Sequence, residues 1–109
     1  MNRKIERLLR VNLEFLHLNK QVETELGLSL IQYHLLEKIR HRPACSPQRL
    51  AEAAGIHPAS LTQSLKRLQK KGLIFVHMDP RDSRKKVIGL RPQGSAFLKR
   101  FESGIGNFI

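Results

Sequence analysis

Proline and glycine divide the middle of the chain into two short helices, and this spacing constrains the fold more than any other feature. Ser46-Pro47 and His57-Pro58 each place a capping residue before a proline, which suits the first helical position. Gly55 and Gly72 follow the two apolar segments, where glycine commonly ends a helix. The sequence therefore predicts a short helix, a turn and a longer helix over 46–71, which is a helix-turn-helix pattern.

The residues that follow change from a helical period to a strand-like one. Segments 73–76 and 87–90 are rich in β-prone side chains, and the turn formers of 79–84 lie between them. This order predicts a β-hairpin with a charged tip over 73–90. A hairpin directly after a helix-turn-helix is a wing.

Three further helices are predicted around this centre. Residues 1–27 contain no proline and predict one helix that ends at Gly27. A second helix begins after the N-cap Ser29 and is stopped by Pro43. The last helix, over 92–109, opens with proline and is expected to lose support near its two late glycines.

A chain of 109 residues can bury one modest core and no second one. We therefore predict a single domain over 1–109 of mainly α (α+β) class, a winged helix-turn-helix with a two-stranded β wing. No run of about 18 apolar residues could span a bilayer. Cys45 is the only cysteine and cannot form an internal disulfide. We expect a cytoplasmic protein.

The charge is strongly basic and unevenly distributed. The formal net charge is +11 and the pI is near 10.7. Residues 1–57 hold nine basic and six acidic side chains, whereas residues 58–100 hold eleven basic and two acidic ones. A polyanion is therefore the expected partner, and the longer helix and the hairpin are the expected binding surface.

The outward face of the longer helix carries the short polar and basic side chains that a helix in a DNA major groove needs. Gln63 can form two hydrogen bonds with adenine, and serine or threonine can reach bases or phosphates. An ordinary solvated helix face would show the same residue types. The candidate DNA-binding residues of this helix are Ser60, Thr62, Gln63, Ser64, Lys66 and Arg67.

The hairpin adds a second basic surface, to which Lys70 and Lys71 lead. Arginine on a narrow projection suits the minor groove, where the negative potential is enhanced. Helix and hairpin would then straddle one backbone of double-stranded DNA, and this context favours DNA binding over a plain solvated face. The candidate DNA-binding residues of the wing are Arg81, Ser83, Arg84, Lys85 and Lys86.

Over about 60% of the chain, the order and spacing of these motifs resemble the winged helix core of MarR family transcriptional regulators. The resemblance implies a homodimer that binds a pseudo-palindromic operator and regulates transcription. It also implies that Ser60, Thr62 and Gln63 lie near bases. The stretches that carry it are Leu30-Ile31-Gln32-Tyr33, Leu50-Ala51-Glu52, Ser60-Leu61-Thr62, Leu68-Gln69-Lys70-Lys71-Gly72-Leu73-Ile74, Asp79-Pro80-Arg81-Asp82-Ser83-Arg84, and Leu90 with Gly94.

For the wing, the resemblance implies that Arg81 or Arg84 enters the minor groove and that Asp79 or Asp82 steadies the hairpin through Arg84. Three departures limit the transfer. Gln63 stands where the family often has arginine, so the operator sequence does not carry over. The second departure is Arg91, at a position where threonine or serine usually caps the helix after the wing. Finally, the family usually continues beyond position 109 through a long helix that builds the dimer.

A dimer is therefore expected to use the first helix and the end of the chain. The apolar residues of 1–27 form two helical rows that together are wider than a surface helix needs, and the late apolar residues would otherwise be exposed. Packing within one chain and a frayed tail are the alternatives. The family's ligand pockets lie near this interface, and because the long helix that builds it is missing here, a site for a small-molecule effector is disfavoured. The candidate dimerisation residues are Leu8, Val11, Phe15, Leu18, Phe97, Phe101 and Phe108, with Ile105 and Ile109 beside them.

Other functions find less support in the sequence. No nucleophile elbow, phosphate loop or paired-carboxylate motif is present, so we expect neither an enzyme nor a cofactor. The alternative function is a winged helix module for protein–protein or non-specific nucleic-acid binding. Membrane binding by the first helix is disfavoured because acidic residues interrupt its positive face. These are Glu6, Glu14, Glu23 and Glu25.

The single cysteine and the histidines suggest two further kinds of site. Cys45 is either a small apolar filler or a redox switch whose pKa the nearby Arg40, His41 and Arg42 would lower. Neither an i, i+4 histidine pair on one helix nor a CxxC motif is present, so surface or capping roles are favoured over a metal site. The five histidines are His17, His34, His41, His57 and His77.

Overall fold

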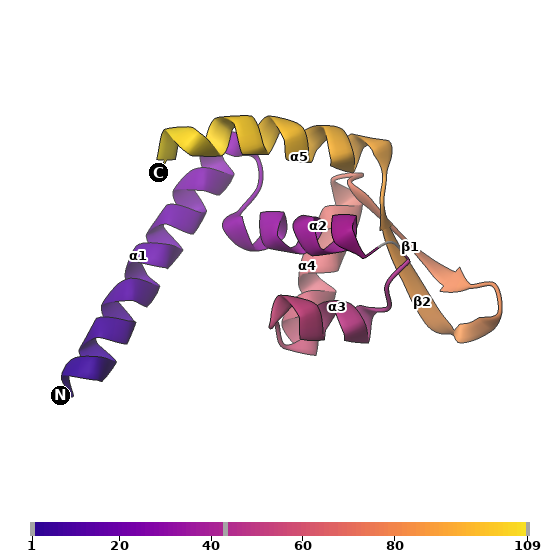
Figure 1. Ribbon diagram of the computed structural model, residues 1–109, viewed down its shortest axis with the longest axis horizontal. Helices are drawn as coiled ribbons and strands as arrows, with labels where there is room; N and C mark the ends of the chain where they lie inside the picture. Colours follow the sequence, from indigo (N-terminus) through magenta and orange to yellow (C-terminus); the bar gives the residue numbers. More distant parts are fainter. Residues whose placement is uncertain (1, 43, 109) are drawn as a thin grey trace.

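The computed structural model describes residues 2–42 and 44–108 (Figure 1). Met1, Pro43 and Ile109 lie outside the described residues, and with them the helix stop expected at Pro43 and the interface role expected of Ile109. The elements are, in order, α1 (Arg3–Leu26), α2 (Leu30–His41), α3 (Pro47–Ala54), α4 (Pro58–Lys70), β1 (Ile74–Asp79), β2 (Asp82–Leu90), α5 (Pro92–Ile105) and the 3-10 turn η1 (Gly106–Phe108).

Capping chemistry sets the helix ends where the sequence predicts them. The Ser29 side chain accepts from the Gln32 backbone N–H, and the Gln32 side chain accepts from the Ser29 N–H, which makes a complete capping box for α2. Ser46 accepts from the Arg49 N–H at the start of α3. Gly27 and Gly55 end α1 and α3 in the left-handed conformation, at φ 84° and 68°.

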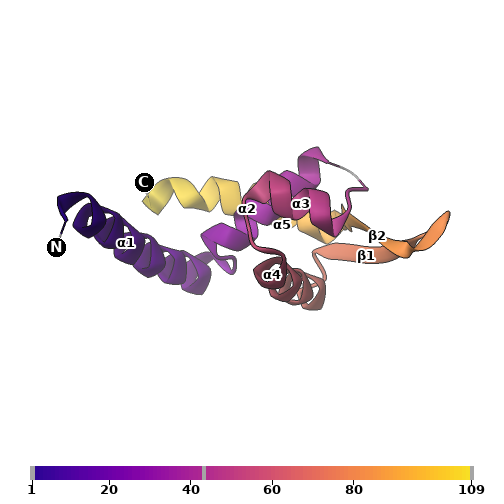
Figure 2. The same ribbon diagram turned by 90° about the horizontal axis from the view of Figure 1, so that it is seen from below.

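Helix α5 and the helix-turn-helix with the hairpin tip lie on opposite sides of the molecule. In Figure 1, α5 runs along one edge, while α3, the beginning of α4 and the tip of the hairpin lie on the opposite side. Figure 2 views the molecule from that opposite side and shows α3, α4 and the projecting hairpin together. Helix α1 projects from the body and buries only Val22. The core lies between α2, α3, α4, the hairpin base and α5, around Leu35, Leu50, Leu68, Ile88 and Leu98.

The strands of the hairpin are longer than the sequence predicts. β1 and β2 pair antiparallel from Ile74↔Leu90 to Asp79↔Asp82, with an irregularity after Met78. The expected loop over 79–84 therefore shrinks to a tight turn, because pairing that starts at the apolar base extends into charged residues. At the base, the Ile88 N–H donates to the Cys45 carbonyl at 2.9 Å, which fixes β2 to the loop before α3.

Glycines let α5 pack closely on two neighbours. A Cβ at Gly94 would lie 2.1 Å from the Leu73 carbonyl oxygen, and one at Gly104 would lie 2.9 Å from Leu26 Cδ2. The α-helix ends at Ile105 and passes into the 3-10 turn at Gly106, close to the two late glycines as the sequence predicts, although Gly104 itself is still helical. The missing side chain at position 104 instead makes room for the end of α1.

Within the described residues, none of the helices has both the length and the apolar character that crossing a membrane requires.

Candidate nucleic-acid interface

Helix α4 has a buried leucine face and an exposed polar face. Leu61, Leu65 and Leu68 are 2%, 7% and 0% exposed, as their spacing predicts. His57 caps the helix, because its Nδ1 accepts from the Ala59 N–H at 3.2 Å. Because the leucines face the core, the opposite side of α4 faces solvent.

The predicted residues of α4 fall into two groups. Gln63, Lys66 and Arg67 are exposed opposite or nearly opposite the leucines. Ser60 and Ser64 lie on one flank, where they line an apolar hollow of about 540 Å³ together with Phe15 of α1. The structure therefore brings the two serines toward α1 and α2 rather than to the centre of the exposed face.

Thr62 lies on the other flank and is exposed. Its Oγ1 donates to the Pro58 carbonyl at 3.1 Å, so its proton is engaged inside the helix while its lone pairs still face outward. A DNA base could therefore meet Thr62 as an acceptor.

Two residues of this face were missed from the candidate set. Ala59 lies one helical turn before Gln63, and Lys70 lies two turns after it, and both are exposed. Their spacings from Gln63, four residues for Ala59 and seven for Lys70, place both on the same helix face and could have predicted them. A search for polar side chains does not predict Ala59, although its methyl group can contact the methyl of thymine.

The wing presents all of its predicted residues to solvent. The Arg84 side chain is 89% exposed, and its Nε and backbone N–H both donate to Asp82 Oδ1, at 3.2 and 3.0 Å. Asp82 is thus the carboxylate that steadies the hairpin through Arg84, while Asp79 accepts from the Arg81 N–H at 2.8 Å. Arg81, Ser83, Lys85 and Lys86 are likewise exposed.

Lys71 does not belong to the basic surface that was predicted to lead into the hairpin. Its Nζ donates to the Gly27 carbonyl at 2.9 Å and to Gln32 Oε1 at 3.0 Å. These acceptors lie at the α1–α2 junction, so Lys71 ties the end of α4 to that junction. Arg91 likewise joins two elements of the fold, because its Nε donates to the Ile74 carbonyl at 3.2 Å. Its side chain does not cap α5.

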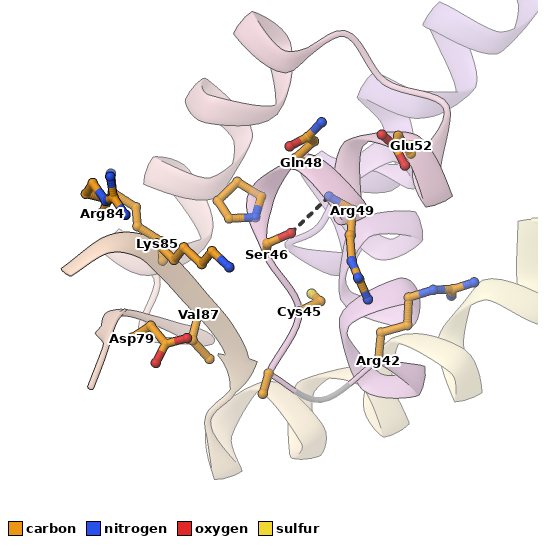
Figure 3. Close-up of a pocket in the computed structure, with 13 residues that line it drawn as sticks. Arg42, Cys45, Ser46, Gln48, Arg49, Glu52, Asp79, Arg84, Lys85 and Val87 are labelled. Carbon is orange, nitrogen blue, oxygen red and sulfur yellow. Dashed lines mark hydrogen bonds between the residues drawn. The ribbon is translucent and has the colours of Figure 1, made fainter. Parts of the chain in front are cut away.

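A basic groove of about 910 Å³ separates α3 from the wing (Figure 3). Its lining includes two acidic side chains, Glu52 and Asp79. The basic side chains that line it are Arg42, Arg49, Arg84, Lys85 and Lys86. Arg42 and Arg49 had not been recognised as candidate residues, because the groove joins segments that are some 40 residues apart in the sequence.

The candidate dimerisation residues divide by burial. Leu8, Val11 and Phe15 of α1 are 60%, 57% and 38% exposed. Leu18, Phe97 and Phe108 are partly buried against the core. Phe101 must be removed from the set, because it is 1% exposed and its ring stacks on Tyr33 at 4.7 Å within the same chain.

Cys45 has the environment of a core residue. It is 7% exposed, and burial raises the pKa of its thiol, which is the opposite of what a reactive redox cysteine requires. His34 Nε2 lies 3.0 Å from the Ala54 carbonyl, and His41 pairs with Glu37. Among the residues of 2–42 and 44–108, no three His, Cys, Asp or Glu side chains are grouped to hold a metal ion.

Comparisons with known proteins point to one family. Residues 28–86 match the family model described as MarR family. The HTH-type transcriptional regulator YdgG of Bacillus subtilis (strain 168) is 30% identical over 98 residues, covering 88% of this chain and 64% of that protein. Transcriptional regulator HosA of Escherichia coli O111:H- is 31% identical over 67 residues, covering 62% and 50%. The chain thus spans between half and two thirds of these curated relatives.

Solved structures share the fold. A mutant MarR from E. coli complexed with operator DNA superposes with a TM-score of 0.82 at 24% identity, over 97% of this chain and 76% of that one. The transcriptional repressor CouR bound to a DNA duplex gives a TM-score of 0.81 at 22% identity, over 92% and 70%. The winged helix fold predicted from the sequence is thereby confirmed.

Proposed function

Since the chain belongs to the MarR family, we propose that it is a transcriptional regulator that binds duplex DNA as a homodimer on a pseudo-palindromic operator. The observation that carries the proposal is the exposed face of α4 beside a basic wing. The beginning of α4 and the tip of the wing both lie on the side of the molecule away from α5 (Figure 1). Such a regulator acts where bacterial DNA lies, in the cytoplasm.

Gln63 is the residue proposed to read sequence. It is exposed on the face of α4 opposite the leucines, and a glutamine amide can bond both N6 and N7 of adenine in the major groove. Ala59, one turn earlier, can contact a thymine methyl. Arg81 and Arg84 are proposed for the minor groove, where Asp82 holds Arg84 in place. The half-site is therefore expected to contain an A·T pair at the position of Gln63.

The proposed dimer uses the exposed apolar face of α1. A single chain leaves Leu8, Val11 and Phe15 at 60%, 57% and 38% exposure, an unusual arrangement for a helix in water. A second copy would cover them and would present two recognition helices to successive turns of DNA, about ten base pairs apart. The transcriptional repressor CouR, a structural neighbour, was itself captured on a duplex.

Selection of bound sequences from a random duplex library at about 0.15 M salt tests the proposal, because weak non-specific binding is suppressed there. An enriched inverted repeat with half-sites about ten base pairs apart is the expected result. Tight binding that is lost in salt without any enrichment would contradict it and would indicate a non-specific nucleic-acid module. Failure to bind duplex at low salt would leave protein–protein binding as the better function.

The same selection with Gln63→Ala tests the recognition helix. We expect a loss of about 1 to 3 kcal/mol on the preferred site and a relaxed preference at one base pair per half-site. Gln93→Ala removes the same side chain from an exposed position on α5 and should change neither. An unchanged preferred sequence in the Gln63 variant would show that α4 does not lie in the groove as proposed.

A further inference from the structure

The C-terminal end of α4 is bonded to the junction between α1 and α2. Lys71, the C-cap of α4, donates from Nζ to the Gly27 carbonyl at 2.9 Å and to Gln32 Oε1 at 3.0 Å. Gly27 is the C-cap of α1, and Gln32 lies in the first turn of α2. One ammonium group therefore joins three helices, although its two acceptors lie 44 and 39 residues before it in the sequence.

The atoms that Lys71 contacts are held in place by other bonds. Asn19 Oδ1 of α1 accepts from the Leu30 N–H at 2.7 Å, which ties α1 to the start of α2. Gln32 is 4% exposed, and its Oε1 also accepts from the Ser29 N–H at 3.2 Å in the capping box. Lys71 consequently bonds to a junction whose own geometry is already fixed.

Nearer the DNA-facing end, α4 has no such connection to α1. Within residues 2–42 and 44–108, Lys71 alone makes side-chain hydrogen bonds from α4 or its cap to α1, α2 or the residues between them. Phe15, Ser60 and Ser64 instead line the apolar hollow between the two helices. Leucine contacts in the core are non-directional, whereas hydrogen bonds restrict both distance and angle. The angle between α1 and α4 therefore depends on Lys71.

We propose that Lys71 is a positioning residue that fixes the angle between α1 and α4 and thereby sets the spacing of operator half-sites that the homodimer accepts. The inference rests on the proposed function, in which α1 joins two copies and α4 enters the major groove. Recognition helices about 34 Å apart each lie about 17 Å from the two-fold axis. A rotation of about 10° over that distance moves a helix by about 3 Å, which is close to one base-pair step.

The size of the effect follows from the bonds that Lys71 makes. On an operator with one extra base pair between its half-sites, the wild-type homodimer must break these bonds or strain the DNA. The net contribution of such a hydrogen-bonded group corresponds to about fivefold in an equilibrium constant. Lys71→Met keeps the aliphatic chain and removes the donor. This variant should therefore lower the affinity ratio between the normal and the lengthened operator by about fivefold.

The first arm of the experiment measures affinity for the selected operator and for operators one base pair longer or shorter. Lys71→Met should bind the altered spacings relatively better and keep the wild-type salt slope, because Lys71 contacts no phosphate in this arrangement. Lys70→Met is the matched control, and this adjacent exposed lysine should affect the salt slope and leave the spacing preference unchanged. Gln32→Glu keeps an acceptor for both Lys71 and the capping box and should retain the wild-type spacing.

The second arm measures the angle between α1 and α4 without DNA. Nitroxide labels on Arg10→Cys in α1 and Lys66→Cys in α4, both exposed positions, are introduced in a Cys45→Ala background. Excess unlabelled chain leaves only distances within one chain to be measured by double electron–electron resonance. Lys71→Met should broaden the distance distribution, whereas Lys70→Met should keep the narrow distribution of the unsubstituted chain. Matching circular dichroism spectra would show that all variants fold.

A relaxed spacing preference together with a broadened distance distribution in Lys71→Met would support the inference, and the absence of either change would overturn it. A lysine that only stabilises the fold would, when replaced, weaken binding to all spacings alike, which also overturns the inference. In both cases the proposed function stands if the wild-type chain selects an inverted repeat. Failure of the wild-type chain to bind any duplex would instead overturn the proposed function and, with it, the inference about operator spacing.

Discussion

Replacing Gly94 by alanine is the sharpest test of how α5 is seated on the base of the wing. The added Cβ would lie 2.1 Å from the Leu73 carbonyl oxygen and 3.3 Å from Leu90 Cδ2. A relaxed carbon–oxygen contact is about 3.3 to 3.6 Å, so α5 must move by more than about 1 Å from backbone that cannot rotate away. The helix would have to lift from Leu73, the residue just before β1, to accommodate one methyl group.

The expected loss of stability combines two destabilising effects with one stabilising effect. Overpacking of this kind costs about 1 to 3 kcal/mol. The same Leu73 oxygen accepts from the Arg91 N–H at 3.0 Å, and weakening that bond costs about 0.5 to 1.5 kcal/mol. Alanine gains about 1 kcal/mol over glycine inside a helix. The Gly94→Ala variant should therefore lose about 1 to 3 kcal/mol of stability.

Urea unfolding followed by far-UV circular dichroism measures this loss, at one fixed protein concentration because a dimer links stability to concentration. With a slope of about 1 to 3 kcal/mol per molar urea, the midpoint should fall by about 1 M. Gly106→Ala is the control, since a Cβ there meets no atom within 4 Å, and it should not lower the midpoint. A Gly94 variant that unfolds at or above the wild-type midpoint would refute the close approach.

Four other substitutions and one alkylation experiment test assignments made by burial and hydrogen bonding. Lys71→Met should lower the free energy of unfolding by about 1 kcal/mol and have little effect on the salt slope of DNA binding. Lys70→Met should instead flatten that slope. The reverse pattern would contradict a structural role for Lys71 and a DNA-contact role for Lys70. Leu8→Ser should shift sedimentation toward monomer and leave the fold intact, while Phe101→Ala should cost about 3 to 5 kcal/mol of stability; a stable Phe101 variant would show that this ring is not a core residue. Burial raises the pKa of the Cys45 thiol, so the contribution of this thiol to stability is complete below the unfolded pKa of about 8.5 and is lost as pH rises through the higher folded value. Alkylation of Cys45 should therefore be slow at neutral pH and fast once urea unfolds the chain. Fast modification of the folded protein would refute the burial of Cys45.

Much of the fold could be predicted because its signals are local. The capping box at Ser29, the proline after Ser46 and the glycines at 27 and 55 act through atoms within a few residues, so reading them needs no knowledge of the rest of the chain. The strand ends were less predictable, because charged residues such as Arg84 are carried into β2 by pairing with the partner strand.

The candidate site was predicted only as far as helical periodicity reaches. Periodicity separates Leu61 from Gln63, and it therefore identifies the outward face of α4. Periodicity does not predict which other helix packs beside each edge of that face. Ser64 was expected on the DNA-facing surface, yet it lines a hollow next to Phe15 of α1.

The sequence by itself determined the helices, the order of helix-turn-helix and wing, and the sign of the charge, because these depend on residue type and near neighbours. Only the tertiary structure decided that Lys71 joins α4 to the α1–α2 junction, that Phe101 fills the core and that Arg49 and Lys85 line the same groove. Such pairings join residues tens of positions apart, and they depend on how helices and strands pack rather than on any pattern along the chain.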